Sequence, residues 1–210
     1  MTLKRLLNVL ALAIVAPAAA TCQLDRVLGP SSEVVFAFWT HVFAVLPGVP
    51  GLFLRRAWYR WTLDRCAENV IIEFGALFTR RAATLESGVY IGPYALIGSV
   101  WIQENSLIGS RVSLLSGGEH HEWLPSGRWS PTDHSRLKQI VIGANTWVGE
   151  GAILLAGTGE GCMVAAGSVV SRPVPAGLLV AGNPARFVRR VAAETLAAAG
   201  NDEPAISTVR

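Results

Sequence analysis

Two adjacent histidines, His120 and His121, lie between Glu119 and Glu122 in the segment SLLSGGEHHEWLP, which spans residues 113–125. The whole chain has only four histidines, so half of them occur at this one place. Imidazole has an ordinary pKa of about 6.5, which lets it accept and return a proton near neutral pH. A carboxylate or a backbone carbonyl on the other ring nitrogen would fix the tautomer. The pair is therefore a candidate general base, with either glutamate as a candidate partner.

A zinc site is the alternative chemistry for these side chains. His120, His121 and His134 would supply three imidazole ligands, which zinc binds in their neutral form. Adjacent residues of a strand point to opposite faces, however, and no histidine falls on the regular repeat that surrounds this segment. We therefore expect no metal.

A period of about six residues runs through the chain on both sides of the histidines. A large side chain recurs at this interval, and a small or branched residue lies two positions before each one. The recurring residues are Ile72, Phe78, Leu85, Ile91, Ile97, Ile102, Ile108 and Leu114, then Ile142, Val148, Leu154, Thr158, Val164 and Val170.

Six residues is the period neither of a helix nor of an alternating strand. It indicates a chain that makes one short strand per repeat and then turns a corner, with the recurring side chains pointing inward. Three strands would complete a coil of about 18 residues, which gives a little under five coils. A glycine follows several of the inward residues, and we expect it to permit the backbone angles of the corner.

The period stops after Leu114 and resumes at residue 140. The intervening residues 115–139 contain glycines, prolines and charges but no regular inward aliphatic. A long excursion from a regular scaffold is typical of a functional loop. The histidine pair lies in this loop.

Residues 140–190 carry the most specific pattern: a tryptophan after IG, then AGSVV, VP and AGNPAR. This ending resembles that of the hexapeptide-repeat acyltransferases, including galactoside, maltose and polysaccharide O-acetyltransferases. The resemblance covers residues 70–190 and implies a mainly β fold, a left-handed parallel β-helix, which is an exception to the usual right-handed crossover. Thr158 departs from the family, where many members have isoleucine, so we expect its coil to pack less well.

The resemblance implies a homotrimeric enzyme that moves an acetyl group from acetyl-CoA to a sugar hydroxyl of a cell-surface polysaccharide or its precursor. The polysaccharide-type motif SG-x-x-Q-H places the catalytic histidine on His121, with His120 in the glutamine position and His134 as a weaker candidate. N-acetylation of an amino-sugar nucleotide remains open, as does a non-enzymatic β-helix scaffold.

The resemblance also implies residues that bind the cofactor. Trp147 immediately precedes the inward Val148, so it should point outward, either into a cleft between subunits near the pantetheine arm or into a trimer interface. Ala166 and Gly167 fall where the family brings backbone close to the pantetheine.

Arginines near the end of the repeat are candidates for the phosphates of CoA. Guanidinium groups pair well with phosphate, and Arg172 and Arg186 fall where the family binds the 3′-phospho-ADP end of CoA, whereas Arg189 is a weaker candidate. We expect residues 191–210 to form a short closing helix followed by a loose tail.

The front of the chain is strongly apolar, in residues 6–20 and again in residues 34–61. Two prolines interrupt the second stretch, and its end carries a combination typical of a lipid headgroup interface, namely Arg55, Arg56 and Arg60 with Trp58 and Trp61. We expect residues 1–65 to be a membrane-associated helical region, retained on the cytoplasmic face of the inner membrane, where acetyl-CoA is available. A cleaved signal peptide and a buried helical hairpin are the alternatives.

The net charge and the cysteines limit which partners and which cellular compartment the sequence favours. The net charge of +3 is too small to indicate nucleic-acid binding. Cys22, Cys66 and Cys162 show neither a paired framework nor metal-ligand spacing, which favours a reducing compartment. We therefore expect three parts: residues 1–65, an acyltransferase domain over 66–190, and the tail.

Overall fold

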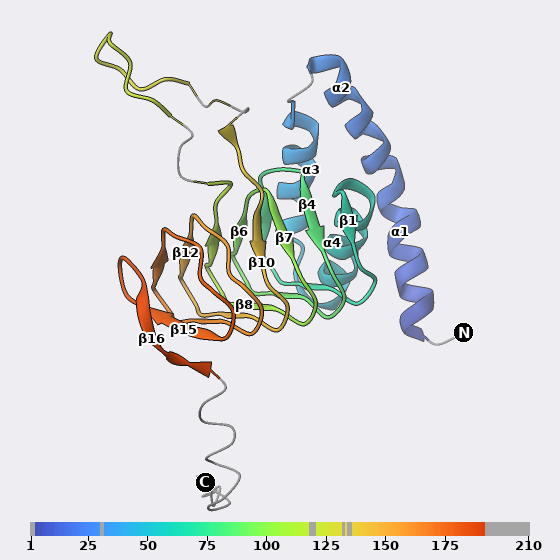
Figure 1. Ribbon diagram of the computed structural model, residues 1–210. Coiled ribbons are helices and arrows are strands. Elements are labelled where there is room, and N and C mark those ends of the chain that lie inside the picture. Colours follow the sequence, from blue (N-terminus) through green and yellow to red (C-terminus); the bar gives the residue numbers. More distant parts are fainter. Residues whose placement is uncertain (1–2, 30–31, 118–120, 132, 134–135, 192–210) are drawn as a thin grey trace, which may run out of the picture.

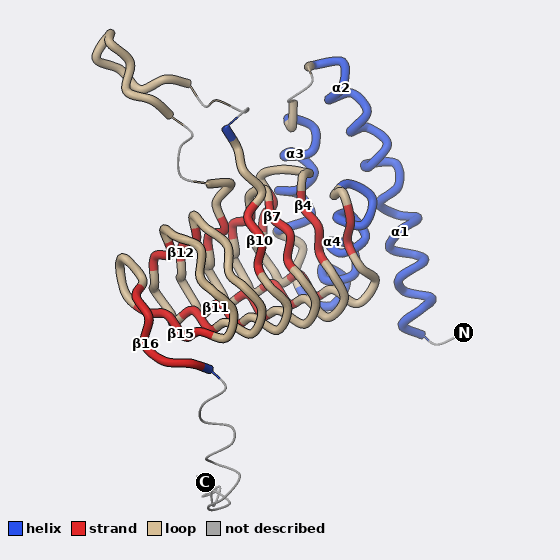
Figure 2. The backbone as a smooth tube through the Cα atoms, in the orientation of Figure 1, coloured by secondary structure: helices blue, strands red, loops and turns tan. Residues whose placement is uncertain are grey.

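The computed structural model describes residues 3–29, 32–117, 121–131, 133 and 136–191. A parallel β-helix forms most of this structure, and helices cover one end of it (Figure 1). The tube view in Figure 2 shows short strands separated by corners along the whole solenoid. The predicted fold class is confirmed.

Three sheets form the sides of the β-helix, and strands in each sheet pair with the equivalent strands one coil away. The β1 face consists of β1 (Arg65–Cys66), β4 (Ala83–Leu85), β7 (Val100–Ile102) and β10 (Ile140–Ile142). The β2 face consists of β2 (Ile71–Ile72), β5 (Tyr90–Ile91), β8 (Leu107–Ile108), β11 (Trp147–Val148), β13 (Met163–Val164), β15 (Leu178–Ala181) and β16 (Arg186–Arg190). The β3 face consists of β3 (Leu77–Phe78), β6 (Leu96–Ile97), β9 (Ser113–Leu114), β12 (Ile153–Leu154) and β14 (Val169–Val170).

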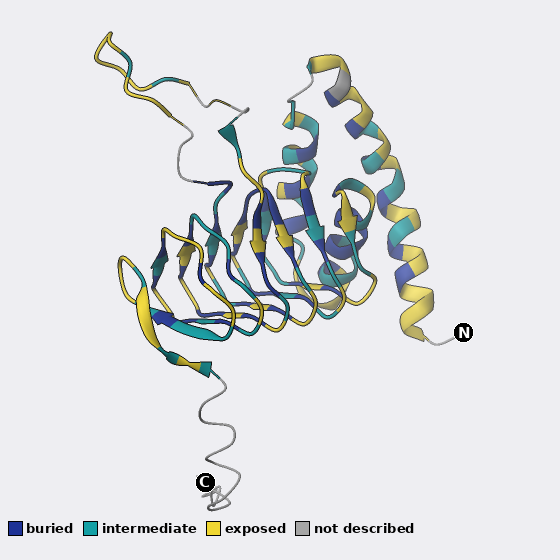
Figure 3. Ribbon diagram, viewed as in Figure 1, coloured by how far each residue is buried: buried dark blue, intermediate teal, exposed yellow. Residues whose placement is uncertain are grey.

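The inward positions are the core of the β-helix. Every recurring residue of the six-residue period is buried, and the interior of the solenoid is lined by them (Figure 3). The number of coils is higher than predicted, because the β2 face alone stacks six parallel strands and gives about six turns. The prediction missed β1, which has Cys66 in place of an aliphatic residue, and the last coil, which follows a proline-rich turn.

The glycines that follow the inward residues have a different role from the one predicted. Gly92 and Gly149 do not have positive φ angles, so corner geometry does not require them. A Cβ atom on Gly92 would lie 2.7 Å from the nitrogen of Ser110, and one on Gly149 would lie 2.6 Å from the nitrogen of Ala166. The backbone of the next coil therefore approaches too closely for a side chain. Left-handed φ angles occur elsewhere in the corners, for example at Asn105.

Helices close the N-terminal end of the β-helix. The helical segments are α1 (Leu3–Thr21), the 3₁₀ turn Cys22–Leu24, α2 (Asp25–Leu28), α3 (Val34–Ala44) and α4 (Gly48–Thr62). α3 contacts β3, α4 contacts β1 and β2, and α1 packs against α4. α1 runs across the β-helix axis at this end rather than along it (Figure 1).

Arg55 joins these helices to the first coil. Its side chain is 1% exposed, and its guanidinium donates hydrogen bonds to the carbonyl oxygens of Ile72 (3.0 Å) and Leu46 (2.6 Å) and to carbonyls at the C-terminal end of α3. Helix C-terminal carbonyls have no partner within the helix and attract positive charge, so they suit a buried guanidinium. Burial lowers the pKa of Arg55, but an arginine keeps its proton at neutral pH.

The neighbouring Arg56 holds α1 in place. It donates to Oδ1 of Asn8 on α1 (2.5 Å) and to the carbonyl of Val70 (3.2 Å). Arg55, Arg56 and the fully buried Trp58 therefore lie inside the protein. The prediction that these three residues face lipid headgroups is wrong, whereas Trp61, which was predicted with them, is 56% exposed.

Asp25 organises the turn from α2 to α3. It is fully buried and accepts hydrogen bonds from the backbone N–H groups of Val35 (2.9 Å) and Phe36 (3.1 Å) and from the hydroxyl of Ser32 (3.1 Å). Arg81 of the β-helix lies 3.5 Å away. Burial alone would raise the pKa of Asp25, but these hydrogen bonds and Arg81 outweigh it and hold the pKa below its ordinary value.

We expect Asp25→Asn to lower the free energy of unfolding by about 2–4 kcal/mol at pH 7, because it removes a buried charge from several donors and from Arg81. A lowered pKa stabilises the fold above the ordinary aspartate pKa of about 4, and this contribution is lost as the pH falls through the lowered value. Denaturant melts from pH 7 down to pH 3 measure this, and the difference between wild type and variant should shrink in acid. The exposed Asp64→Asn is the matched control; an equal loss in both variants would contradict the assignment.

Candidate functional site

The excursion over residues 115–139 leaves the β-helix between β9 and β10, at the edge between the β3 face and the β1 face (Figure 1). Its described part includes a hairpin that projects from the solenoid. Trp123 and Trp129 pair across this hairpin in an antiparallel bridge, and the N–H of Ser130 donates to the carbonyl of Glu122 (2.8 Å). The predicted loop is therefore a folded protrusion over these residues.

His121 lies on this hairpin with its side chain exposed. Its Nδ1 is 2.8 Å from the carbonyl oxygen of Ser130. Because a carbonyl oxygen only accepts, the proton is on Nδ1, and Nε2 is left as the proton acceptor. The partner is thus a backbone carbonyl and not Glu122, whose carboxylate forms an ion pair with Arg136.

The other histidine candidates, His120 and His134, lie outside the described residues, as does Glu119. The zinc alternative depends on two of these residues. Among the residues that the structure describes, no group of three histidine, cysteine or acidic side chains is placed to hold a metal ion.

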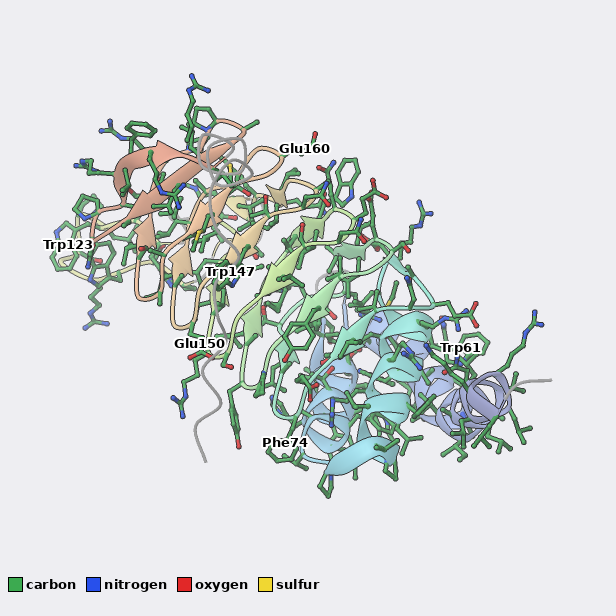
Figure 4. All side chains as sticks on the ribbon, turned by 90° about the horizontal axis from the view of Figure 1, so that it is seen from below. Trp61, Phe74, Trp123, Trp147, Glu150 and Glu160 are labelled. Carbon is green, nitrogen blue, oxygen red and sulfur yellow. The ribbon has the colours of Figure 1, made fainter. Side chains whose placement is uncertain are left out.

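Trp147 begins β11 and lies on the outer side of the β2 face, where it is 50% exposed (Figure 4). Its position before the buried Val148 predicts this orientation. The loop of His121 leaves from the edge opposite the β2 face, because that edge is formed by the β1 and β3 faces. Within one chain, the hairpin that carries His121 and the strand β11 that carries Trp147 therefore lie on different sides of the solenoid (Figure 2).

Ala166 and Gly167 form the exposed corner between β13 and β14. Gly167 has a φ of +68° and donates its N–H to the carbonyl of Glu150 (2.8 Å). β13 pairs directly with β11, so this corner follows the same face as Trp147 one coil further on. The absence of large side chains leaves the backbone accessible at this corner.

Arg172 and Arg186 meet at the C-terminal end of the solenoid, where both line a cavity of about 310 Å³. Apolar side chains, including those of Val170 and Phe187, form much of its wall. No carboxylate in the described part of the chain forms an ion pair with either arginine. The cavity therefore offers two available cations beside an apolar surface.

The strand β16 was not predicted from the sequence. It carries Arg186 and Arg189 and pairs antiparallel with β15. The aromatic and β-branched residues Phe187 and Val188 after the turn AGNPA are the signal that the prediction overlooked. The expected closing helix falls on residues 192–210, which lie outside the described residues.

Comparison with known proteins places the chain in a family. No family model matches the sequence. The chain is 31% identical over 150 residues to a Saccharomyces cerevisiae protein assigned as an acetyltransferase, an alignment that covers 63% of this chain and 68% of that protein. It is 33% identical over 128 residues to WbbJ of Escherichia coli K12, assigned as a lipopolysaccharide biosynthesis O-acetyl transferase.

The coverage of some relatives is partial. The chain spans 65% of the length of WbbJ and 33% of the length of a Staphylococcus aureus protein assigned as an acetyltransferase, to which it is 44% identical over 66 residues. These alignments cover 56% and 30% of this chain.

Solved structures share the fold. A galactoside acetyltransferase in complex with coenzyme A superposes with a TM-score of 0.57 at 21% identity, covering 76% of this chain and 82% of that one. A maltose O-acetyltransferase from Clostridium difficile superposes with a TM-score of 0.55 at 16% identity, covering 76% and 86%. The class that the fold and the six-residue period define is thus that of the parallel β-helix proteins. Within this class, the chain belongs to the acetyltransferase family.

Proposed function

We propose that the protein transfers an acetyl group from acetyl-CoA to a hydroxyl of a cell-surface polysaccharide or its precursor. The observation that carries the proposal is His121, held with Nε2 free on a protruding hairpin that interrupts an acetyltransferase β-helix. The names of the Escherichia coli relative and of the sugar acetyltransferases with the same fold support a glycan acceptor and an oxygen nucleophile.

The geometry of His121 suits a general base. Nε2 accepts the proton of the acceptor hydroxyl while its oxygen attacks the thioester carbonyl carbon. The C–S bond then breaks, and the same imidazole returns the proton to the sulfur of the leaving CoA. The carbonyl of Ser130 keeps the ring in the required tautomer and orientation and stabilises the imidazolium that forms between the two steps.

The proposed binding site for acetyl-CoA consists of Trp147, Ala166, Gly167, Arg172 and Arg186. The indole of Trp147 and the open corner at Ala166 and Gly167 suit the pantetheine arm, which needs an apolar surface and close access to backbone. Arg172 and Arg186 suit the phosphates, because guanidinium groups bind phosphate oxygens with paired hydrogen bonds. No carboxylate in the described part of the chain forms an ion pair with Arg172 or Arg186, so both guanidinium groups are available to bind phosphate.

An amine acceptor is the second candidate. AntD, an N-acyltransferase from Bacillus cereus solved with dTDP and 3-hydroxybutyryl-CoA, has the same fold with a TM-score of 0.50 at 16% identity and covers 65% of this chain and 87% of that one. The same base would serve an amine. Release of CoA with amino-sugar nucleotides but not with neutral glycans would favour this candidate.

The proposed oligomer is a homotrimer, and the separation of the two residue sets supports it. His121 and Trp147 lie on different sides of one solenoid, so a site that uses both requires the loop of one subunit against the β2 face of another. A closed ring of three copies satisfies this requirement equally for each copy.

We expect His121→Ala to lower kcat by about 10²- to 10⁴-fold, because it removes the general base, while CoA affinity and melting temperature stay unchanged. The assay follows thiol release from acetyl-CoA with maltose, p-nitrophenyl galactoside and de-O-acetylated O-antigen polysaccharide as acceptors. His41→Ala, an exposed histidine on α3, is the matched control. Retained activity in His121→Ala together with loss in His120→Ala would move the base by one residue.

Mixed oligomers test the shared site. His121→Ala and Trp147→Ala subunits, each nearly inactive alone, should regain activity when they are denatured, mixed and refolded, because about a quarter of the sites then combine an intact loop with an intact β2 face. A matched mixture in which both subunits carry His121→Ala should stay inactive. Failure of the first mixture to exceed the second, with mixed trimers present by mass, would place each site within one chain.

The helical end is proposed to lie on the cytoplasmic face of the inner membrane. In the described chain, Leu3–Leu24 is the single stretch long and apolar enough to cross a membrane. The inner side of α1 already packs against the rest of the protein. Asn8 accepts a hydrogen bond from Arg56, and the side chains of Ala11 and Val15 are buried. Its outer side exposes large apolar residues along its length (Figure 3), namely Leu3, Leu6, Leu7, Val9, Leu10 and Ile14.

A helix apolar on its outer side and fixed on its inner side suits a position in the membrane surface rather than across the bilayer. Lys4 and Arg5 at its start favour anionic headgroups. Because α1 crosses the end of the solenoid, the β-helix would then project from the membrane into the cytoplasm.

We expect the double substitution Leu10→Glu and Ile14→Glu to reduce binding to vesicles of phosphatidylethanolamine and phosphatidylglycerol about tenfold or more, because it places negative charge on the lipid-facing side. Co-sedimentation measures binding. Val188→Glu, at an exposed apolar residue on β16 at the other end of the molecule, is the control. An equal loss in the control, or none in the double variant, would contradict the proposed orientation.

A further inference from the structure

Two tryptophans at the hairpin tip have no role in the chemistry described so far. Trp123 and Trp129 are 62% and 66% exposed, and their ring centroids lie 5.3 Å apart in an edge-to-face arrangement. Large aromatic side chains normally find burial, and exposed aromatic clusters mark binding surfaces. The antiparallel bridge between the two residues holds both rings at the same point of the hairpin.

The hairpin register places these rings beside the proposed base. Trp123 and Trp129 are directly opposite in the antiparallel bridge, so their side chains share one face of the hairpin. His121 precedes Trp123 by two residues, and its Nδ1 lies 2.8 Å from the carbonyl oxygen of Ser130, the residue that follows Trp129. The base and the indole pair are thus held on the same short hairpin.

The chemistry of this surface fits a sugar. An indole offers a flat apolar face and one N–H donor, and a pyranose ring offers C–H groups on its faces and hydroxyls around its rim. A sugar stacked on the indoles would keep its hydroxyls at the edge of the platform, within reach of Nε2 of His121. The turn between the tryptophans contains the exposed polar residues Ser126 and Arg128, which suit a hydrated glycan better than a lipid.

We propose that Trp123 and Trp129 form the acceptor subsite, a stacking platform that binds a pyranose of the glycan and presents a hydroxyl to His121. This inference rests on the proposed function and adds to it the residues that bind the acceptor. The platform lies far from α1, at the other side of the molecule in Figure 1, so the proposed membrane surface does not cover it.

The kinetic test compares single alanine and phenylalanine substitutions at both positions. Trp123→Ala and Trp129→Ala should each raise KM for the polysaccharide acceptor about tenfold, because each removes one aromatic surface on which the sugar ring stacks. The phenylalanine variants should be affected less, because they keep an aromatic face. KM for acetyl-CoA should stay at the wild-type value, and Trp61→Ala, a 56% exposed tryptophan on α4, should change neither constant.

A binding test separates this inference from the proposed function. The full chain with His121→Ala is titrated calorimetrically with maltotetraose and with de-O-acetylated O-antigen polysaccharide in the absence of acetyl-CoA. Binding that is retained in His121→Ala and lost when Trp123→Ala and Trp129→Ala are added supports the platform, whether or not the wild type releases CoA. An unchanged acceptor affinity in the triple variant overturns it. Dissociation of the oligomer by either tryptophan substitution, seen by light scattering, also overturns it and assigns the pair to a subunit contact.

Discussion

The close stacking of one coil on the next is the constraint on which the rest of the structure depends. Inward residues such as Ile91 and Ile108 are fully buried, and the backbones at the corners approach so closely that Gly92 and Gly149 leave no room for a Cβ atom. This spacing fixes the register of every strand pair. It also lets the loop be inserted without cost to the solenoid, because β10 pairs directly with β7 and β12 pairs directly with β9 across the excursion.

The β-helix was predictable because its signal is local and repeated. Each inward position is identified by its spacing from the last one, so the core followed from the sequence even at Thr158, where the aliphatic residue is missing. The hydroxyl of Thr158 is buried without a hydrogen-bond partner among the described residues, and strand pairing there is reduced to isolated bridges. An unsatisfied buried hydroxyl costs about 1–3 kcal/mol, which agrees with the expectation of a less well packed coil.

The positions of Arg55 and Arg56 were misread because arginines within an apolar stretch have two physical explanations. They bind lipid headgroups, or they neutralise the carbonyls at a helix end inside the protein, and the sequence does not distinguish the two. The structure selects the second for Arg55, whose acceptors come from α3 and from β2. The partner of His121 was equally hidden, because Ser130 lies nine positions away across a hairpin. The spacing of two tryptophans around PSG in WLPSGRW was the overlooked sign of that hairpin.

The candidate binding surfaces lie at different places on the solenoid because the β-helix is rigid. A stack of short strands offers flat sides and two ends but no deep cleft, so a reaction that joins a nucleotide donor to a glycan needs surfaces brought from outside the stack. The open end supplies the cavity beside Arg172 and Arg186, the interruption after β9 supplies a protruding hairpin with His121, and the closed end supplies the apolar side of α1. A polymeric acceptor can reach a protruding platform without entering a pocket, whereas acetyl-CoA needs an extended track along the coils. In the proposed trimer, the hairpin of one subunit would face the track of its neighbour, which is an arrangement that a rigid β-helix can offer to the proposed glycan acceptor.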